Sequence, residues 1–170
     1  MPVIRRHVAE ILLVEEGPLE VAIQTLIEVE KTVVEGAGAA ALAALLGHRE
    51  RFAGRRVGLV LSGGNIDSRL LSAVLLRGLV RSRRLIRLRI GAPDSPGSLA
   101  RITALIAERG GNIVEVYHQR AFSQLSVKSA DVDVVVETQG ARHAGELEEA
   151  LRAAGFAVRT TDEAIAAGGL

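Results

Sequence analysis

The order of hydrophobic patterns in the second half of the chain constrains its fold more than any other sequence feature. Between residues 85 and 159, stretches with a two-residue period alternate with stretches whose apolar residues recur every three or four positions. These patterns predict strands at 85–90, 112–121, 130–137 and 156–159, and helices at 97–109 and 144–154. This order of elements, βαββαβ, is typical of the ferredoxin-like fold, in which an antiparallel sheet carries two helices on one face.

The composition indicates how such a sheet is covered. Apolar residues make up 48% of the chain, but aromatic residues only 2%, and Trp is absent. The core must therefore consist of Val, Leu, Ile and Ala, which suits a sheet covered by helices better than an aromatic-rich sandwich of two sheets. In the strand at 130–137, valines at every second position alternate with Asp131 and Asp133, so one face is expected to be buried and the other solvated.

The first half predicts a different series of elements. Its patterns indicate strand, helix, helix, strand and helix at 11–14, 18–31, 38–46, 56–61 and from Asp67 or Ser68 to Val80. The basic segment Arg81–Arg84 separates the halves. We therefore expect an α/β protein with a first domain over 1–81, a second over 82–162 and a flexible tail over 163–170.

Charge and cysteine content exclude several classes of function. The net charge is +1, and the six arginines from Arg77 to Arg89 have no aromatic residue among them that could stack on a base. Arg87 and Arg89 alternate with apolar strand residues, which favours a solvated strand face over a nucleic-acid site. Cysteine is absent, so disulfides and thiolate chemistry are excluded.

Two further classes are not expected. The apolar run Ile11–Val14 is too short for a signal peptide or a membrane span, so we expect a soluble, cytoplasmic protein with no membrane partner. The histidines show no metal-ligand spacing, and His118, between strand residues, is expected to make a structural hydrogen bond. The scattered histidines are His7, His48 and His143. No metal site is predicted.

One motif of the first half could carry chemistry. Ser62, Gly63, Gly64 and Asn65 lie between a predicted buried strand and a helix. Two glycines and a small hydroxyl residue let backbone N–H groups approach an anion or a ring, and the helix N-terminus adds positive potential. An ordinary structural turn would have the same sequence, so this motif alone leaves both interpretations open.

Taken together, four motifs point further. The segments VVEGAGAAALAALL, VGLVLSGGNIDSRLLSAVLLRGLV, LIRLRIGAPDSPGSLARI and GGNIVEVYHQRAF follow one another in an order that resembles the C-terminal region of threonine dehydratases, also called threonine ammonia-lyases. These are fold-type-II pyridoxal-phosphate enzymes, and the resemblance runs from about Pro2 to Thr161. It implies a last part of the catalytic domain followed by an ACT regulatory domain.

The resemblance assigns roles in the cofactor pocket. In the family, the serine of the SGGN turn holds the pyridine nitrogen of the cofactor, which implies this role for Ser62, with Gly63, Gly64 and Asn65 shaping the turn. The EGAGAA segment resembles a loop on the cofactor side, so Glu35 and Gly36 are implied to lie near the pocket. For Glu35 the alternative is an acidic residue that only complements a helix N-terminus.

The family's lysine and phosphate-loop motifs are absent from this sequence. The chain has Lys31 and Lys128, neither in a Schiff-base motif, and no glycine-rich phosphate loop. Without that amine the covalent step has no nucleophile. We therefore assign no catalytic residue and expect the chain alone to be inactive and to bind no pyridoxal phosphate.

The second half resembles an ACT domain, a module that pairs with copies of itself and binds amino acids at the interface. The turn residues of its D-x-P-G-x-L pattern are implied to bind an effector of the isoleucine or valine class, with a facing loop before the second strand. The turn residues are Asp94, Pro96, Gly97, Ser98 and Leu99, and the loop residues are Gly111, Asn112 and Ile113. The alternative is a pair of ordinary turns with no ligand. A homo-oligomer formed through this domain is expected.

The leading hypothesis is the C-terminal portion of a threonine dehydratase, which converts L-threonine to 2-oxobutanoate and ammonia under allosteric control in isoleucine biosynthesis. Two alternatives stay open. One is a stand-alone amino-acid-binding regulator that retains a relic of the catalytic domain. The other is one chain of a split dehydratase, in which a separate chain brings the lysine.

Overall fold

The computed structural model describes residues 2–119 and 129–161. By its internal contacts the chain divides into two compact units, residues 1–78 and 79–170. The predicted tail at 163–170, the loop through Lys128 and the end of the strand predicted to reach residue 121 lie outside the described residues.

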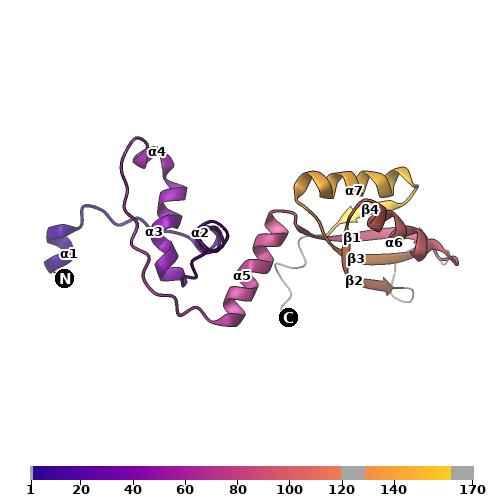
Figure 1. The fold of residues 1–170 in the computed structure, drawn as a ribbon, viewed down its shortest axis with the longest axis horizontal. Coiled ribbons are helices and arrows are strands. Elements are labelled where there is room, and N and C mark those ends of the chain that lie inside the picture. Colours follow the sequence, from indigo (N-terminus) through magenta and orange to yellow (C-terminus); the bar gives the residue numbers. More distant parts are fainter. Residues whose placement is uncertain (1, 120–128, 162–170) are drawn as a thin grey trace. The chain divides into compact units, whose positions relative to one another are not determined.

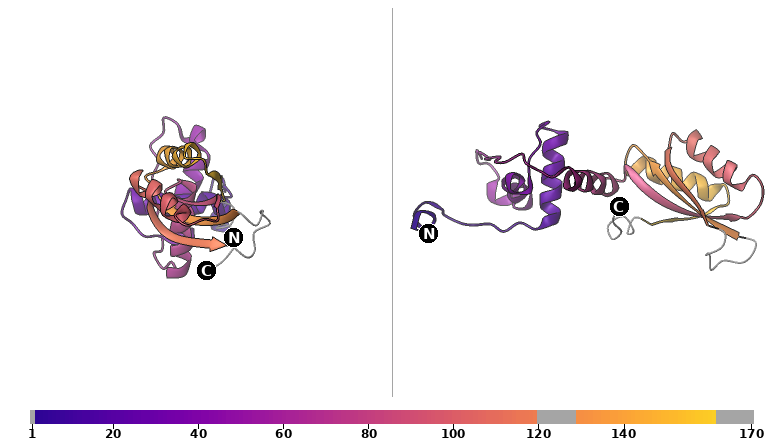
Figure 2. Two further views of the ribbon diagram at one scale, coloured as in Figure 1. Left: turned by 90° about the vertical axis from the view of Figure 1, so that its right-hand side faces the viewer. Right: turned by 90° about the horizontal axis from the view of Figure 1, so that it is seen from below.

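The second unit has the predicted βαββαβ order. Its elements are β1 Leu85–Pro93, α6 Ser98–Glu108, β2 Asn112–Gln119, β3 Ser129–Glu137, α7 Ala141–Ala153 and β4 Ala157–Thr160. The sheet order is β2-β3-β1-β4, and every neighbouring pair is antiparallel. Helices α6 and α7 cover one face of this sheet (Figures 1 and 2). The predicted α/β fold with a ferredoxin-like second domain is confirmed.

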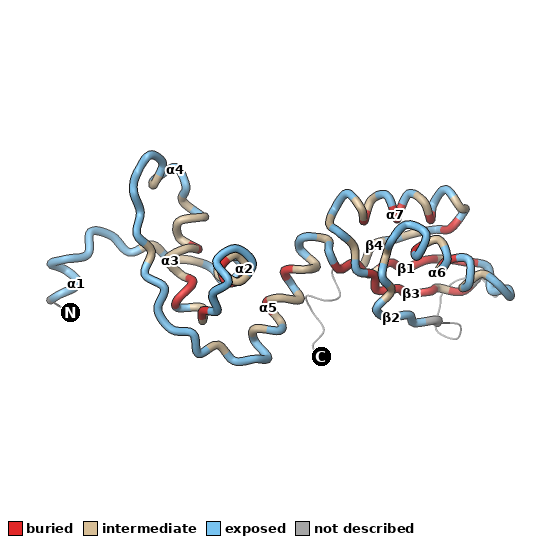
Figure 3. Tube along the Cα trace, viewed as in Figure 1, coloured by how far each residue is buried: buried red, intermediate tan, exposed pale blue. Residues whose placement is uncertain are grey.

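The core of this unit forms between the sheet and its two helices. Residues at alternate positions of β1 and β3 turn toward α6 and α7, and the red segments of these strands in Figure 3 mark their burial. The buried cluster comprises Ile86, Leu88, Ile90, Ala92, Ile102, Ile106, Val132, Val134, Val136, Ala144, Leu147, Leu151 and Phe156. Because this cluster is aliphatic apart from one phenylalanine, burial of branched side chains supplies most of the hydrophobic stabilisation.

The opposite face of the sheet carries the charged residues of the alternating pattern. Arg89 on β1 binds Asp133 on β3 through two hydrogen bonds of 2.8 Å, and this hydrogen bonding and the charge of Asp133 raise the pKa of Arg89. The Arg87 guanidinium lies 5.7 Å from the ring centre of Tyr117. Tyr117 donates a hydrogen bond to Glu115, which raises the pKa of the phenol. Arg87 and Arg89 therefore lie on the outer strand face, as predicted.

The first unit is helical. It contains α1 Pro2–His7, α2 Glu16–Glu28, α3 Gly36–Gly47 and α4 Arg49–Phe52, and α5 Ser68–Arg81 begins in it and ends in the second unit. Its buried cluster is smaller and consists of Ala22, Ile23, Leu26, Val34, Ala39, Ala43 and Val74. The Asp67 carboxylate accepts hydrogen bonds from the N–H groups of Arg69 and Leu70, which confirms Asp67 as the N-cap of α5.

The prediction of two strands in this unit is wrong. Residues 11–14 and 56–61 have no regular secondary structure, and none of the described residues of the first unit forms a strand with which they could pair. A strand is stabilised by a neighbouring strand, so an apolar run by itself does not create one. Leu13 is 89% exposed and Val60 81% exposed.

The three predicted helices of the first unit are confirmed with shifted ends. The helix predicted at 18–31 runs from Glu16 to Glu28 and ends three residues before Lys31, which has a left-handed conformation with φ of 55°. The helix predicted from Gly38 begins two residues earlier, at Gly36. The short helices α1 and α4 have too few residues to show a clear period and were not predicted.

Candidate functional site

The fold brings together the two segments of the first unit that the sequence singles out. Glu35 is the N-cap residue of α3, and its N–H donates a 3.1 Å hydrogen bond to the carbonyl oxygen of Gly63, twenty-eight positions later. The predicted pocket residues Glu35 and Gly36 therefore lie beside Ser62–Asn65, although these segments are far apart in the chain.

Glycine is required where these segments touch. A Cβ on Gly63 would lie 2.3 Å from Oε1 of Glu35, and Gly63 has φ of +77°. A Cβ on Gly38 would lie 2.2 Å from the Ser62 carbonyl oxygen, so the backbone of α3 packs directly on the loop. Gly36, by contrast, has open space around its missing Cβ. Sequence reasoning missed Gly38, whose only signal is a glycine inside an alanine-rich helix.

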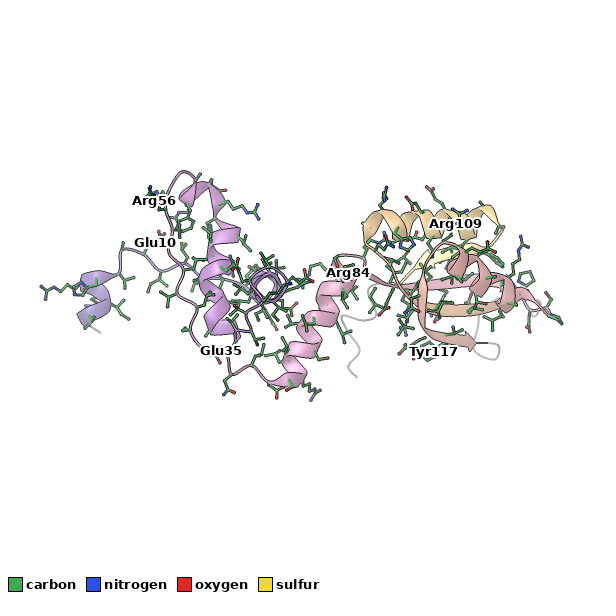
Figure 4. The ribbon with its side chains drawn as sticks, in the orientation of Figure 1. Glu10, Glu35, Arg56, Arg84, Arg109 and Tyr117 are labelled. Atoms are coloured by element: carbon green, nitrogen blue, oxygen red, sulfur yellow. The ribbon has the colours of Figure 1, made fainter. Side chains whose placement is uncertain are left out.

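The loop presents polar groups to solvent. Ser62, Gly63, Gly64 and Asn65 are exposed, and Glu35 lies at the beginning of α3 (Figure 4). The Glu35 carboxylate makes no capping hydrogen bond, and the first N–H groups of α3 have no partner within the helix. This surface can hold a polar edge of a planar group through the Ser62 hydroxyl, and the helix terminus adds positive potential.

Of the two lysines, the structure describes Lys31, which lies just after the end of helix α2. Lys31 Nζ donates a 2.6 Å hydrogen bond to the carbonyl oxygen of Glu28, which closes α2, and its side chain is exposed. Lys31 is therefore an exposed residue near a helix end. Lys128 lies outside the described residues.

A second candidate site lies in the turn between β1 and α6. A cavity of about 160 Å³ is bounded by both predicted and unpredicted residues. Its lining comprises Ala92, Pro93, Asp94, Ser95, Pro96, Gly97, Ser98, Leu99, Ala130 and Val132. All five turn residues predicted for effector binding are among them. The sequence missed Ala130 and Val132, because their contribution depends on how β1 and β3 pair. The other residues that were not predicted, Ala92, Pro93 and Ser95, adjoin the predicted turn residues in the chain.

The geometry of this turn exposes the first turn of α6. Gly97 is the N-cap residue, with φ of 92°, and no side chain caps the helix. The Ser98 N–H donates to the carbonyl oxygen of Ser95, and the two serine hydroxyls are 3.0 Å apart. The next N–H groups have no partner within the helix. The cavity therefore combines hydrogen-bond donors and hydroxyls with the apolar floor of Leu99 and Val132.

The loop predicted to face this turn lies at the other end of the sheet. Asn112 pairs with Glu137 in the ladder, and its side chain donates a 2.8 Å hydrogen bond to the Glu137 carboxylate, whereas Pro93 pairs with Ser129. A Cβ on Gly111 would lie within 2.9 Å of core side chains, and Ile113 packs against the core. Within one chain the structure does not bring Gly111, Asn112 and Ile113 to the cavity.

The remaining polar residues form structural contacts. Among the described residues, no three His, Cys, Asp or Glu side chains gather as metal ligands. His143 accepts a hydrogen bond from the Gln139 N–H and contacts the carbonyl oxygen of Arg109, so it joins the beginning of α7 to the end of α6. The His118 side chain lies outside the described part of the structure. No helix within the described ranges is long and apolar enough to span a membrane.

Comparison with protein families identifies the second unit. Residues 86–156 match the model of the ACT domain, a range that includes α6, β2, β3, α7 and all but the first residue of β1 and ends just before β4. The second unit is therefore an ACT domain, as the motifs predicted.

Comparison with individual proteins extends the similarity to most of the chain. It is 41% identical over 157 residues to the L-threonine ammonia-lyase of Geobacter sulfurreducens and 35% identical over 156 residues to that of Thermotoga maritima. Each match covers 92% of this chain but 39% of the relative, so the chain spans about two fifths of the length of these proteins. A shorter match, 39% identical over 66 residues, is to the L-threo-3-hydroxyaspartate ammonia-lyase of a Pseudomonas species. The predicted resemblance to the C-terminal region of threonine ammonia-lyases with an ACT domain is confirmed.

Proposed function

We propose that this chain provides the C-terminal portion of a threonine dehydratase: one side of a pyridoxal-phosphate pocket and an amino-acid-sensing ACT domain. The observation that carries this proposal is the contact between the Glu35 and Ser62–Asn65 segments. The similarity to threonine ammonia-lyases extends over 92% of the chain, so it is not limited to a common regulatory module.

The chain's own residues would act on one edge of the cofactor. When bound, pyridoxal phosphate supplies an electron sink for loss of the α-proton and the β-hydroxyl of threonine. Ser62 would hold the pyridine nitrogen with its hydroxyl group, which, unlike a carboxylate, does not enforce protonation of the ring. Gly63, Gly64 and Asn65 would keep this hydroxyl in place for the ring nitrogen, and Gly38 would allow the loop to pack against α3.

The chain alone lacks the groups for the whole reaction. The sequence contains neither a Schiff-base motif around Lys31 or Lys128 nor a phosphate-binding glycine loop, so it has no nucleophile for the covalent step. The purified chain is expected to show no aldimine absorbance with pyridoxal phosphate and no threonine-dependent release of ammonia. Either signal at stoichiometric level would contradict this part of the proposal.

A mixing experiment with the same ammonia assay separates the two alternatives, a split dehydratase and a stand-alone regulator. If a second polypeptide with the lysine and phosphate-loop motifs restores ammonia release when mixed with this chain, the split dehydratase is correct. If such a polypeptide does not associate and the chain still binds an amino acid, the stand-alone regulator is favoured.

The cavity between β1 and α6 is the proposed effector site. This cavity of about 160 Å³ has an apolar floor, which suits an aliphatic side chain, and the first turn of α6 presents donors to a carboxylate. Isoleucine or valine at millimolar concentration is expected to raise the melting temperature of the chain. Gly97→Val is expected to abolish this shift because Gly97 has φ of 92°. Gly145→Ala, on an open part of α7, is the control; absence of any shift in the unaltered chain would contradict effector binding.

A second copy of the chain would bring the missing part of this site. Gln119 and Gly91 both pair with Asp131, so β2 ends at the same end of the sheet as β1. Antiparallel pairing of β2 with the β2 of a partner would therefore place the partner's 111–113 segment at the cavity end. The edge strand β2 exposes Val114, Val116 and Tyr117, with exposed fractions of 49%, 40% and 46%.

This arrangement predicts a symmetric dimer with Asn112 at the shared site. Val116→Lys is expected to dissociate the dimer in analytical ultracentrifugation, since it places a charge on the edge strand. Asn112→Ala is expected to weaken effector binding while the dimer persists. A monomeric chain that binds effector with full affinity would contradict the shared site.

A further inference from the structure

An arginine occupies a position where glycine is usual. Helix α5 ends at Arg81, and the Arg83 and Arg84 N–H groups donate to the carbonyl oxygens of Val80 and Leu79. These bonds define a Schellman C-cap, in which the residue at the place of Arg83 adopts a left-handed conformation. Arg83 has φ of 56°, which costs free energy for a residue with a Cβ.

Contacts to Thr138, which follows β3, and to Glu148 on α7 hold Arg83 in this conformation. Its carbonyl oxygen accepts a hydrogen bond from the Thr138 hydroxyl, and the Thr138 N–H donates to the carbonyl oxygen of Arg84 at 2.8 Å. Its guanidinium forms an ion pair with Glu148 on α7. The Glu148 carboxylate also accepts hydrogen bonds from Arg152 at 2.7 Å and from the Thr160 hydroxyl on β4 at 2.9 Å. We refer to Arg83, Thr138, Glu148 and Thr160 as the α5 anchor.

The anchor is more than a surface ion pair. Glu148 is 8% exposed, and the Nε of Arg83 is buried with no hydrogen-bond acceptor among the described residues. A strained backbone conformation and a buried polar atom without a partner persist only where the surroundings impose them, and such features concentrate at functional positions.

Two strands connect the anchor to the effector cavity. Strand β1 begins directly after Arg84 and ends at Ala92 and Pro93, which line the cavity. Strand β3 carries Ala130 and Val132 near its beginning, which also line the cavity, and it ends one residue before Thr138. These strands pair along nine positions, so an unbroken hydrogen-bonded ladder joins the cavity end to the anchor end.

We propose that the α5 anchor transmits occupancy of the β1–α6 cavity to the C-terminal end of α5. This inference rests on the proposed effector function. Helix α5 begins directly after the Ser62–Asp67 segment and contributes Val74 to the core of the first unit, so its end is a suitable point for control. Arg83 and Glu148 are positioning residues in this scheme. A ligand can shift α5 only if the bound and free states hold Arg83 differently.

Amide hydrogen exchange, followed by mass spectrometry, tests the anchor without ligand. Arg83→Gly removes the ion pair and also the strain of the left-handed conformation. If the anchor holds α5, amides of residues 79–84 are expected to exchange roughly threefold faster or more in this variant, and likewise in Glu148→Gln. If Arg83 is only a helix cap, the amides of residues 79–84 exchange in Arg83→Gly at the rate of the unaltered chain or more slowly. This result would overturn the proposal. Arg142→Ala, also on α7 and with a 92% exposed side chain, is the control.

The same measurement with isoleucine and with valine at millimolar concentration tests transmission. In the unaltered chain, protection is expected both at 93–99 and at 79–84. In Arg83→Gly and Glu148→Gln, protection at 93–99 is expected to persist while the response at 79–84 is lost. An unchanged response at 79–84 in both variants would overturn the anchor and leave the effector site intact. Absence of protection at 93–99 in the unaltered chain would instead overturn effector binding, and transmission with it.

Discussion

The two units of this chain differ in whether their short apolar segments form strands. In the ACT domain, every predicted strand finds an antiparallel neighbour within the same unit, and thirteen buried residues form one core. In the first unit, seven buried residues form a core between helices, while the apolar segments 11–14 and 56–61 form no strand and pair with no other strand. A helix satisfies its backbone locally, but a strand depends on another segment. The same kind of apolar run therefore becomes β-structure in one unit and irregular chain in the other.

The largest expected effect tests the closed core of the ACT domain. Leu147→Ala removes a completely buried side chain of α7 and is expected to destabilise this unit by about 2–5 kcal/mol. Urea unfolding monitored by hydrogen exchange should show early loss of protection in β1 and β3, with α2 and α3 unaffected. Glu149→Ala, at an exposed position of α7, is the control. Equal destabilisation of both units would show that they unfold as one.

The next effect tests the contact that builds the loop in the first unit. Gly38→Ala places a Cβ 2.2 Å from the Ser62 carbonyl oxygen, so α3 and the loop must separate, at an expected cost of about 1–3 kcal/mol. Gly47→Ala, in the same helix but with open space around its Cβ, should be neutral or slightly stabilising. Thermal unfolding of both variants checks this, and equal stability would mean that the contact does not hold the loop.

A smaller effect depends on pH and sharpens the contrast between the units. Desolvation alone would raise the pKa of Glu148, but hydrogen bonds from Arg152, Thr160 and Arg83 and the charge of Arg83 together lower it. Its stabilisation is therefore complete above the ordinary pKa and is lost as the pH falls through the lower folded-state value. Glu148→Gln should lower the free energy of unfolding of the ACT domain at neutral pH by about 1–2 kcal/mol, a modest cost because the arginine partners of Glu148 are partly exposed. It should also flatten the acid limb, which is the loss of stability as the pH falls.

Glu146→Gln is the matched control for the pH experiment. Glu146 lies on the same helix, its side chain is 55% exposed, and its contact to Arg142 is 3.8 Å long. Chemical denaturation of both variants between pH 3 and pH 7 is the measurement. If Glu146→Gln flattens the acid limb as much as Glu148→Gln does, the buried cluster is not the source of the pH dependence.

The smallest effect tests whether the unpaired segments contribute to the first unit. Leu13→Ser and Val60→Ser change side chains that are 89% and 81% exposed, so stability should change by no more than about 0.5 kcal/mol. Light scattering should show less self-association, because exposed apolar surface decreases. A loss of more than about 1 kcal/mol in either variant would mean that these segments are packed in solution.

The candidate sites were predictable to different degrees. The motif around Ser62 and the Asp94–Leu99 turn follow from local sequence, because glycine, proline and small hydroxyl residues set the backbone of a turn. The contact of Gly38 with Ser62 and the contribution of Val132 to the cavity could not be predicted, since each joins segments that are distant in the chain. The position of the segment Gly111–Ile113 could not be predicted for the same reason. It was expected to face the cavity, but the β2–β3 and β1–β3 pairing places it at the other end of the sheet.

The sequence by itself determined the βαββαβ order, the longer helices of both units and the family resemblance, because periodicity and turn residues are local properties. Only the tertiary structure decided which apolar runs became strands, which glycines had to be glycine, and that Arg83 takes a left-handed conformation. Those outcomes depend on contacts between distant segments: a strand requires a neighbour, a Cβ requires space, and a strained backbone requires partners such as Thr138 and Glu148 to hold it.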